Sequence, residues 1–197
     1  MQLSHLSLAS ALAIMLCPQS AEALETTAKT RIEAPDNSRN YINMRVGSTS
    51  SNRNSHPEIC LETSPLSFFS IEACGTGTGI LHTDPAPSSA HFRTKFKALQ
   101  WNFNDWDLSL FGGLGFAEFQ IGEDAPGFIF SGVGKDRVET AGAEVSAHLR
   151  TLIPVYKGFD LLTEFTVSGA YVPYAPDLIT PLSSFQPAFS LTIGAGF

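Results

Sequence analysis

The last thirteen residues of the chain alternate between apolar and small or polar side chains up to the final residue. Successive side chains of a β-strand point to opposite faces, so this period of two predicts a strand with one apolar face. The run exceeds the length of about 5–6 residues that is usual in soluble sheets, and it stops on an aromatic residue, which together favour a strand that faces lipid. The apolar positions are Phe185, Pro187, Phe189, Leu191, Ile193, Ala195 and Phe197.

The same alternation recurs through most of the chain after residue 40. It predicts strands at 41–48, 91–103, 106–121, 139–153, 157–173 and 185–197. Single-chain bacterial barrels have an even number of strands, so the segment 54–82 is expected to supply two more. The predicted fold is all-β, an antiparallel up-and-down transmembrane β-barrel of about eight strands.

The expected connections alternate in length, which is typical of outer-membrane barrels with short periplasmic turns and long extracellular loops. Asn102–Asp105 and Pro154–Gly158 are short, whereas His82–Ala90, Gly122–Arg137 and Tyr174–Ser184 are long. With the C-terminus in the periplasm, Gly122–Arg137 and Tyr174–Ser184 are expected to lie outside the cell.

The N-terminus resembles an export signal. An apolar run, Leu6–Leu16, precedes Pro18 and the small-residue site Ala21-Glu22-Ala23. We therefore expect a signal peptide at 1–23, a polar periplasmic tail at 24–39 and the barrel at 40–197. Cys17 follows Met15 and Leu16, a poor match to a lipidation site.

Removal of the signal leaves two cysteines, Cys60 and Cys74. An even pair in an exported chain predicts one disulfide. Two buried thiols are the alternative, and neither arrangement suggests catalysis.

The chain carries a formal net charge of −7 and has no basic stripe, which argues against nucleic acid as a partner. After the signal, no apolar run reaches the length of a transmembrane helix. A barrel is then the remaining way to span a bilayer.

The last nine residues resemble the C-terminal β-signal of bacterial outer-membrane barrels. The matching positions are Phe189, Leu191, Ile193 and the terminal Phe197. The resemblance is to small barrels of the size of the OmpA membrane domain and PagP. It implies location in the bacterial outer membrane, contact with its lipid and recognition by the barrel assembly machinery, and it is nearly silent on activity.

Charged residues share the inward-facing parity of the expected strands. Buried charges must be paired, so we expect an ion network that fills the narrow lumen of an eight-stranded barrel. Its candidate members are Arg45, His91, Arg93, Lys95, Lys97, Glu144, Arg150, Asp160 and Glu164.

Two chemical sites are alternatives to this structural network. Ser146 and His148 share one face of a strand, and Glu164 on the next strand could orient the imidazole, as in a hydrolase. No oxyanion-hole motif accompanies them. His82, Asp84 and His91 flank one loop but are too scattered to predict a metal site, so no metal or cofactor is expected.

Three functional hypotheses remain open. The first is a non-enzymatic barrel with a plugged polar lumen and a structural or surface-interaction role through its extracellular loops, whose partner is unknown. The second is a lipid-modifying acyl hydrolase that uses Ser146 and His148. The third is a soluble periplasmic barrel that binds a small apolar ligand.

Overall fold

The structure is a computed structural model that describes residues 41–51, 56–77, 87–122, 127–156, 158–180 and 182–197. The predicted signal peptide at 1–23 and the tail at 24–39 lie outside the described residues, as do His82 and Asp84.

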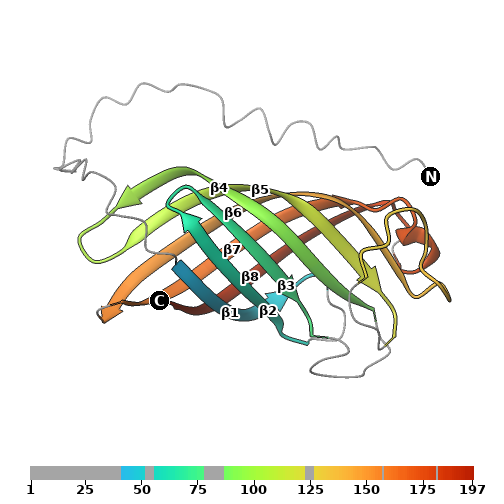
Figure 1. The fold of residues 1–197 in the computed structure, drawn as a ribbon, viewed down its shortest axis with the longest axis horizontal. Helices are drawn as coiled ribbons and strands as arrows, with labels where there is room; N and C mark the ends of the chain where they lie inside the picture. Colours follow the sequence, from blue (N-terminus) through green and yellow to red (C-terminus); the bar gives the residue numbers. More distant parts are fainter. Residues whose placement is uncertain (1–40, 52–55, 78–86, 123–126, 157, 181) are drawn as a thin grey trace, which may run out of the picture. The chain divides into compact units, whose positions relative to one another are not determined.

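Eight antiparallel strands form a closed barrel in which each strand pairs with the next and β8 pairs with β1 (Figure 1). The predicted all-β, up-and-down barrel of eight strands is thus confirmed. The strands are β1 Tyr41–Thr49, β2 Glu58–Leu66, β3 Phe69–Gly75, β4 Ser88–Asn102, β5 Asp107–Gln120, β6 Glu139–Tyr156, β7 Phe159–Tyr171 and β8 Phe185–Gly196.

The segment 54–82 supplies two strands, as expected, and they are β2 and β3. Some boundaries differ from the prediction. β4 begins at Ser88, within the loop predicted at His82–Ala90. β6 continues through Pro154, where the register with β7 shifts, so the following turn is shorter than Pro154–Gly158. Proline tolerates such a position because a bulge does not need its missing N–H.

Connections at the two ends of the barrel differ in length. The short-turn end carries the β2–β3, β4–β5 and β6–β7 turns, and the long-loop end carries the other connections. The β7–β8 connection contains a single helical turn, η3 (Ala175–Asp177), drawn in red-orange in Figure 1. No helix among the described residues is long and apolar enough to span a membrane.

The polarity of the barrel is reversed relative to an ordinary soluble sheet protein. Consecutive residues of one strand make this clear: Met44 is 61% exposed, whereas Arg45 is 1% exposed. On β6, Val145 is 59% exposed beside Glu144 at 2%. The outer wall is therefore apolar, and the interior is lined mainly by buried polar and charged side chains.

In addition to the buried Phe111 and Leu162 towards the short-turn end, apolar side chains fill the interior near the long-loop end. There, inward-facing residues of β5 and β7 pack with residues of the β7–β8 connection in one buried cluster. Its members are Ala117, Phe119, Ala170, Val172, Ala175 and Ile179, with Ile121 and Leu178 packed against them. η3 therefore contributes its buried Ala175 to the apolar end of the lumen.

One outward position of the prediction is not exposed. Ala141 has the parity of the outer face, but it is only 1% exposed. Its backbone N–H donates to the carbonyl oxygen of Ile129 at 2.8 Å. The β5–β6 loop thus lies against the outer wall at this end of the barrel.

Candidate functional site

Four carboxylates and four permanent cations meet inside the barrel, and all eight side chains are buried. The strand register places them because every second residue of each strand faces inwards. The carboxylates are Glu62, Glu72, Glu144 and Glu164, and the cations are Arg45, Arg93, Lys95 and Arg150. We call these eight residues the lumen network; their formal charges cancel.

Two glycines make room for contacts across β5. Gly115 lies between Arg93 on β4 and Glu144 on β6 in the strand register. Without an intervening side chain, Arg93 Nη2 donates to Glu144 Oε1 at 2.8 Å. Any Cβ at Gly115 would overlap the carbonyl oxygen of Phe92. Gly113, one inward position further along, likewise leaves room for Ser146.

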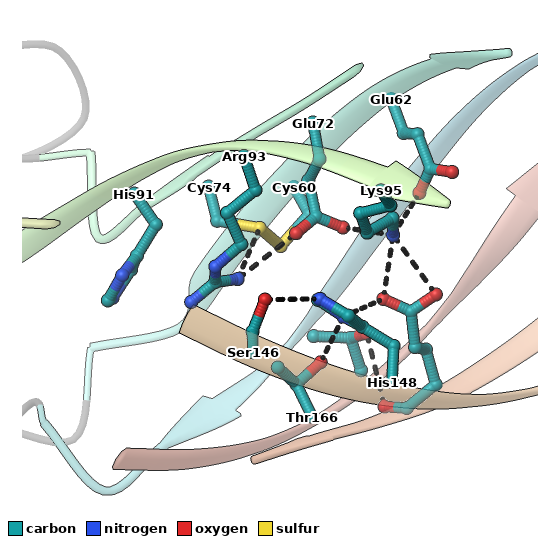
Figure 2. Close-up of polar contacts among 12 residues, drawn as sticks. Cys60, Glu62, Glu72, Cys74, His91, Arg93, Lys95, Ser146, His148 and Thr166 are labelled. Carbon is teal, nitrogen blue, oxygen red and sulfur yellow. Dashed lines mark hydrogen bonds and ion pairs between the residues drawn. A yellow bond between two sulfur atoms is a disulfide. The ribbon is translucent and has the colours of Figure 1, made fainter. Parts of the chain in front are cut away.

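Cations lie between carboxylates of like charge at the centre of the network. Lys95 Nζ donates to Glu62 Oε2 and to Glu72 Oε2, each at 2.7 Å, and to Glu164 Oε1 at 3.1 Å. Arg45 forms ion pairs with the same three glutamates. Figure 2 shows Lys95 between Glu62 and Glu72. Burial of these carboxylates is therefore compensated by direct charge pairing.

Arg150 completes the network from the short-turn side. Its Nε donates to Glu164 Oε2 at 2.7 Å, and its Nη2 pairs with Glu62. The guanidinium lies 4.8 Å from the ring centroid of Phe111, a cation–π contact. The ring of Phe111 thus borders the lumen network on its short-turn side.

The predicted Ser146, His148 and Glu164 are brought together. Ser146 Oγ is 2.8 Å from His148 Nε2, and His148 Nδ1 is 3.2 Å from Glu164 Oε1. Thr166 Oγ1 also lies 3.1 Å from Nδ1 (Figure 2). This is the order nucleophile, base and orienting acid. His148, however, is fully buried, and Glu164 also pairs with three cations.

The remaining predicted members lie at the edges of the network. His91 Nδ1 is 3.1 Å from both oxygens of Glu144. Lys97 does not join the described ion pairs; its Nζ donates to Gln100 Oε1 at 2.9 Å. Lys97 and Asp160 instead line a cavity of about 300 Å³ at the short-turn end. The β4 register shifts just after Lys97, which turns Leu99 outwards.

The predicted disulfide is present. Cys60 and Cys74 face each other across β2 and β3, with a Cα–Cα distance of 4.0 Å. The bond lies one inward position from Glu62 and Glu72, the two network carboxylates that the sequence prediction missed. A signal for both existed: they share the parity of the cysteines, and a bridged cross-strand pair fixes the register of its neighbours.

Two groups of described side chains have the spacing of a metal site. In the first, Glu58, Cys60 and Cys74, the two cysteines are bonded to each other and are not free ligands. The second group has no such bond. Glu72, His148 and Glu164 bring ligand atoms within 4.8 Å of one another. Lys95 already contacts both carboxylates, so this group does not fit a cation. The sequence suggestion at His82, Asp84 and His91 falls partly outside the described residues.

No protein-family model and no curated protein matches the chain. Among solved structures, the chain is similar to the crystal structure of the N-terminal β-barrel domain of Pseudomonas aeruginosa OprF. The match has a TM-score of 0.42 and 8% identity, and it covers 81% of this chain and 98% of the other. A likeness of this strength carries no argument about function.

Proposed function

We propose that the chain is an outer-membrane β-barrel whose lumen is plugged by its own side chains, and that it acts as a structural or surface-interaction protein rather than a pore. The reversed polarity of the wall carries the proposal. Large apolar side chains of the strands face outwards, whereas the charged residues of the lumen network are buried. In water this distribution is unfavourable, whereas in lipid it is the expected one.

Aromatic residues support the placement of the barrel in a bilayer. Trp101 and Trp106 flank the β4–β5 turn and are partly exposed, at 43% and 37%. At the other end, Tyr171 of β7 pairs with Phe185 of β8 in the strand register. Trp and Tyr gather at both membrane interfaces in such barrels. The C-terminal residues Phe189, Leu191, Ile193 and Phe197 agree with delivery by the barrel assembly machinery.

The lumen network and the apolar cluster support a closed lumen. Side chains of the network are at most 6% exposed in their ion pairs. The cluster around Phe119 and Val172 occupies the long-loop end. An eight-stranded barrel is just wide enough for side chains to fill it. We therefore assign function to the loops at the long-loop end.

Membrane fractionation combined with gel mobility tests this proposal. The protein is expected to sediment with outer membranes and to run at different positions when boiled and unboiled. Recovery in the soluble periplasmic fraction without a mobility shift would favour the soluble ligand-binding barrel instead. In planar bilayers we expect no conductance above background; steady channels would contradict the plug.

A second candidate function is acyl hydrolysis, and one observation favours it: the Ser146–His148–Glu164 contacts. Ser146 is partly exposed within the barrel. Deletion of the gene, complemented with the wild type or with Ser146→Ala, tests it through the mass spectrum of lipid A. A lipid change that the Ser146→Ala variant fails to reverse would support hydrolysis. An unchanged spectrum on deletion would exclude that substrate.

A further inference from the structure

A cavity of about 300 Å³ lies inside the barrel at the short-turn end, and we call it the short-turn cavity. Its volume is at the lower end of the range for small-molecule sites. Phe111 and the network residue Arg150 line it, and so do the exposed residues Ser67 and Gln100. The cavity therefore opens at the short-turn end, and the lumen network separates it from the apolar cluster at the other end.

The wall of the short-turn cavity carries one cation and two acids that lie outside the lumen network. Lys97 of β4, Asp107 of β5 and Asp160 of β7 all line the cavity, and each is partly buried. None of the ion pairs found among the described residues includes any of the three. Asp107 is on the strand next to that of Lys97, whereas Asp160 is three strands away around the barrel. The cavity thus presents opposite charges from separate parts of its wall.

One buried hydroxyl of the short-turn cavity has no hydrogen-bond partner among the described residues. It belongs to Ser70 of β3, which is 1% exposed and lines the cavity. β3 pairs with β4, and the backbone N–H of Lys97 donates to the carbonyl oxygen of Phe68 at 2.8 Å. Ser70 and Lys97 therefore come from neighbouring strands. Buried hydroxyls are normally hydrogen-bonded, so Ser70 offers a donor to whatever occupies this side of the cavity.

Apolar surface lies beside these polar groups. The ring of Phe111 is 6% exposed and lies 5.9 Å from Lys97 Nζ, measured to the ring centroid. Arg150 approaches the same ring at 4.8 Å, and none of its hydrogen bonds to described residues uses Nη1. Leu152 also lines the cavity. Convergent polar groups around an apolar surface are typical of small-molecule sites.

The two signs of charge limit the class of ligand. A simple anion would meet Asp107 and Asp160, and a simple cation would meet Lys97. A molecule that carries both a carboxylate and an ammonium group satisfies both kinds of side chain. Hydrogen bonds between charged partners are about twice as strong as neutral ones, so such a match contributes both affinity and orientation.

We propose that the short-turn cavity binds a free amino acid with an apolar side chain. Lys97 and Ser70 donate to its carboxylate, and Asp160 accepts from its ammonium group. The apolar side chain contacts Phe111 and Leu152. The proposal goes beyond the plugged barrel and does not require it, because the cavity lies entirely on the short-turn side of the lumen network.

Binding of L-phenylalanine to the folded mature chain in detergent micelles, measured by titration calorimetry, tests this site. Two analogues each lack one charge: 2-phenylethylamine has no carboxylate, and 3-phenylpropanoate has no ammonium group. We expect L-phenylalanine to bind at a single site per chain. Each analogue should bind about tenfold or more weakly, because it loses a hydrogen bond to a charged group. No binding of L-phenylalanine would show a cavity filled by water only and would overturn the proposal, as would equal binding of all three compounds.

Two substitutions assign the two ends of the ligand. Lys97→Gln should weaken binding of L-phenylalanine about tenfold or more and leave that of 2-phenylethylamine unchanged. Asp160→Asn should likewise weaken binding of L-phenylalanine and leave that of 3-phenylpropanoate unchanged. The matched controls are Lys135→Gln and Asp136→Asn, because both residues are exposed in the β5–β6 connection at the other end of the barrel. Both controls should bind as the wild type does.

The gel mobility of the folded barrel shows which variants are informative. Neither Lys97 nor Asp160 belongs to an ion pair among the described residues, so both variants should keep the mobility shift on boiling. If one loses it, the other decides. Wild-type affinity for L-phenylalanine in a folded variant would contradict the proposal. An equal loss for the amino acid and for the analogue that lacks the group in question would also contradict it, because the side chain would then act on the shape of the cavity.

Discussion

Glu62 on β2 and Glu72 on β3 lie directly opposite each other, and each is only 1% exposed. Two like charges in this position repel, and directly opposed like charges destabilise a sheet. Here Lys95 and Arg45 each bind both carboxylates. Glu62 and Glu72 are therefore stable side by side only because the cations of the lumen network pair with both. Removal of one charged residue of the network should lower the stability of the whole folded barrel.

Glu164→Gln tests this dependence. The substitution removes the carboxylate that pairs with Arg45, Lys95 and Arg150. Loss of one partner of a buried ion pair typically costs about 3–5 kcal/mol, since a charge is left uncompensated. We expect a loss of that size in the free energy of unfolding, measured by urea titration in lipid vesicles. Asp105→Asn in the exposed β4–β5 turn is the control; an equal effect of both would contradict the network.

Gly115 and Gly112 allow a matched test of how closely β4 and β5 approach each other. A Cβ at Gly115 would overlap the Phe92 carbonyl, whereas at Gly112 nothing lies within 4 Å. Overpacking typically costs about 1–3 kcal/mol, and backbone overlap more. Gly115→Ala should therefore abolish or strongly reduce the yield of folded protein on a semi-native gel. Gly112→Ala should fold as the wild type does. Equal yields would mean that β4 and β5 are further apart than described.

The disulfide should matter for stability but not for the fold. Cys60 and Cys74 are separated by 14 positions in sequence. A bridge that closes a loop of about 15 residues contributes about 3 kcal/mol by restricting the unfolded chain. Replacement of both cysteines by serine should lower the free energy of unfolding by about this amount. The mobility shift on boiling should persist. Loss of all folded protein would instead give the bond a role in assembly.

A lysine on the outer wall distinguishes lipid from water as its surroundings. Val167 is 48% exposed near mid-height of β7, and Val155 is 62% exposed at the short-turn end. Lysine at the midplane of a bilayer costs about 2–4 kcal/mol, falling to about 0–1 near the interface. Val167→Lys should therefore destabilise the barrel in vesicles, and Val155→Lys should have little effect. Equal, small losses would indicate a wall that faces water.

The number and order of strands could be predicted because the period of two is local and persists through each strand. The end of β6 was less accurate because the strand continues through Pro154 to Tyr156 with a register shift, and a bulge has no clear sequence signal. β4 also begins at Ser88, before the predicted start at 91. Covered positions were also missed. Ala141 and Glu118 have outward parity but are buried where residues 127–129 contact them. Alternation alone does not show where a loop folds back.

Much of the candidate site followed from parity. Arg45, Arg93, Lys95, Glu144, Arg150 and Glu164 meet in the structure from positions that the alternation places inside. Parity did not predict which charges pair, because partners are chosen by register across three or four strands. Glu62 and Glu72 were missed because strands in 54–82 were expected but not positioned. Lys97 and Asp160 are inward-facing but too near the short-turn end to join the described ion pairs.

If the apolar wall faces lipid, the two tryptophans should lie at the membrane interface. Trp101 and Trp106 are the chain's only tryptophans, and both flank the β4–β5 turn. The barrel would be refolded into vesicles whose lipids carry a bromine quencher at either a shallow or a deep position of the acyl chain. We expect both lipids to quench tryptophan fluorescence, and the shallow quencher to do so more strongly, because the two residues lie at the membrane interface. Fluorescence unaffected by either lipid, in protein that shows the folded gel mobility, would contradict a wall that faces lipid.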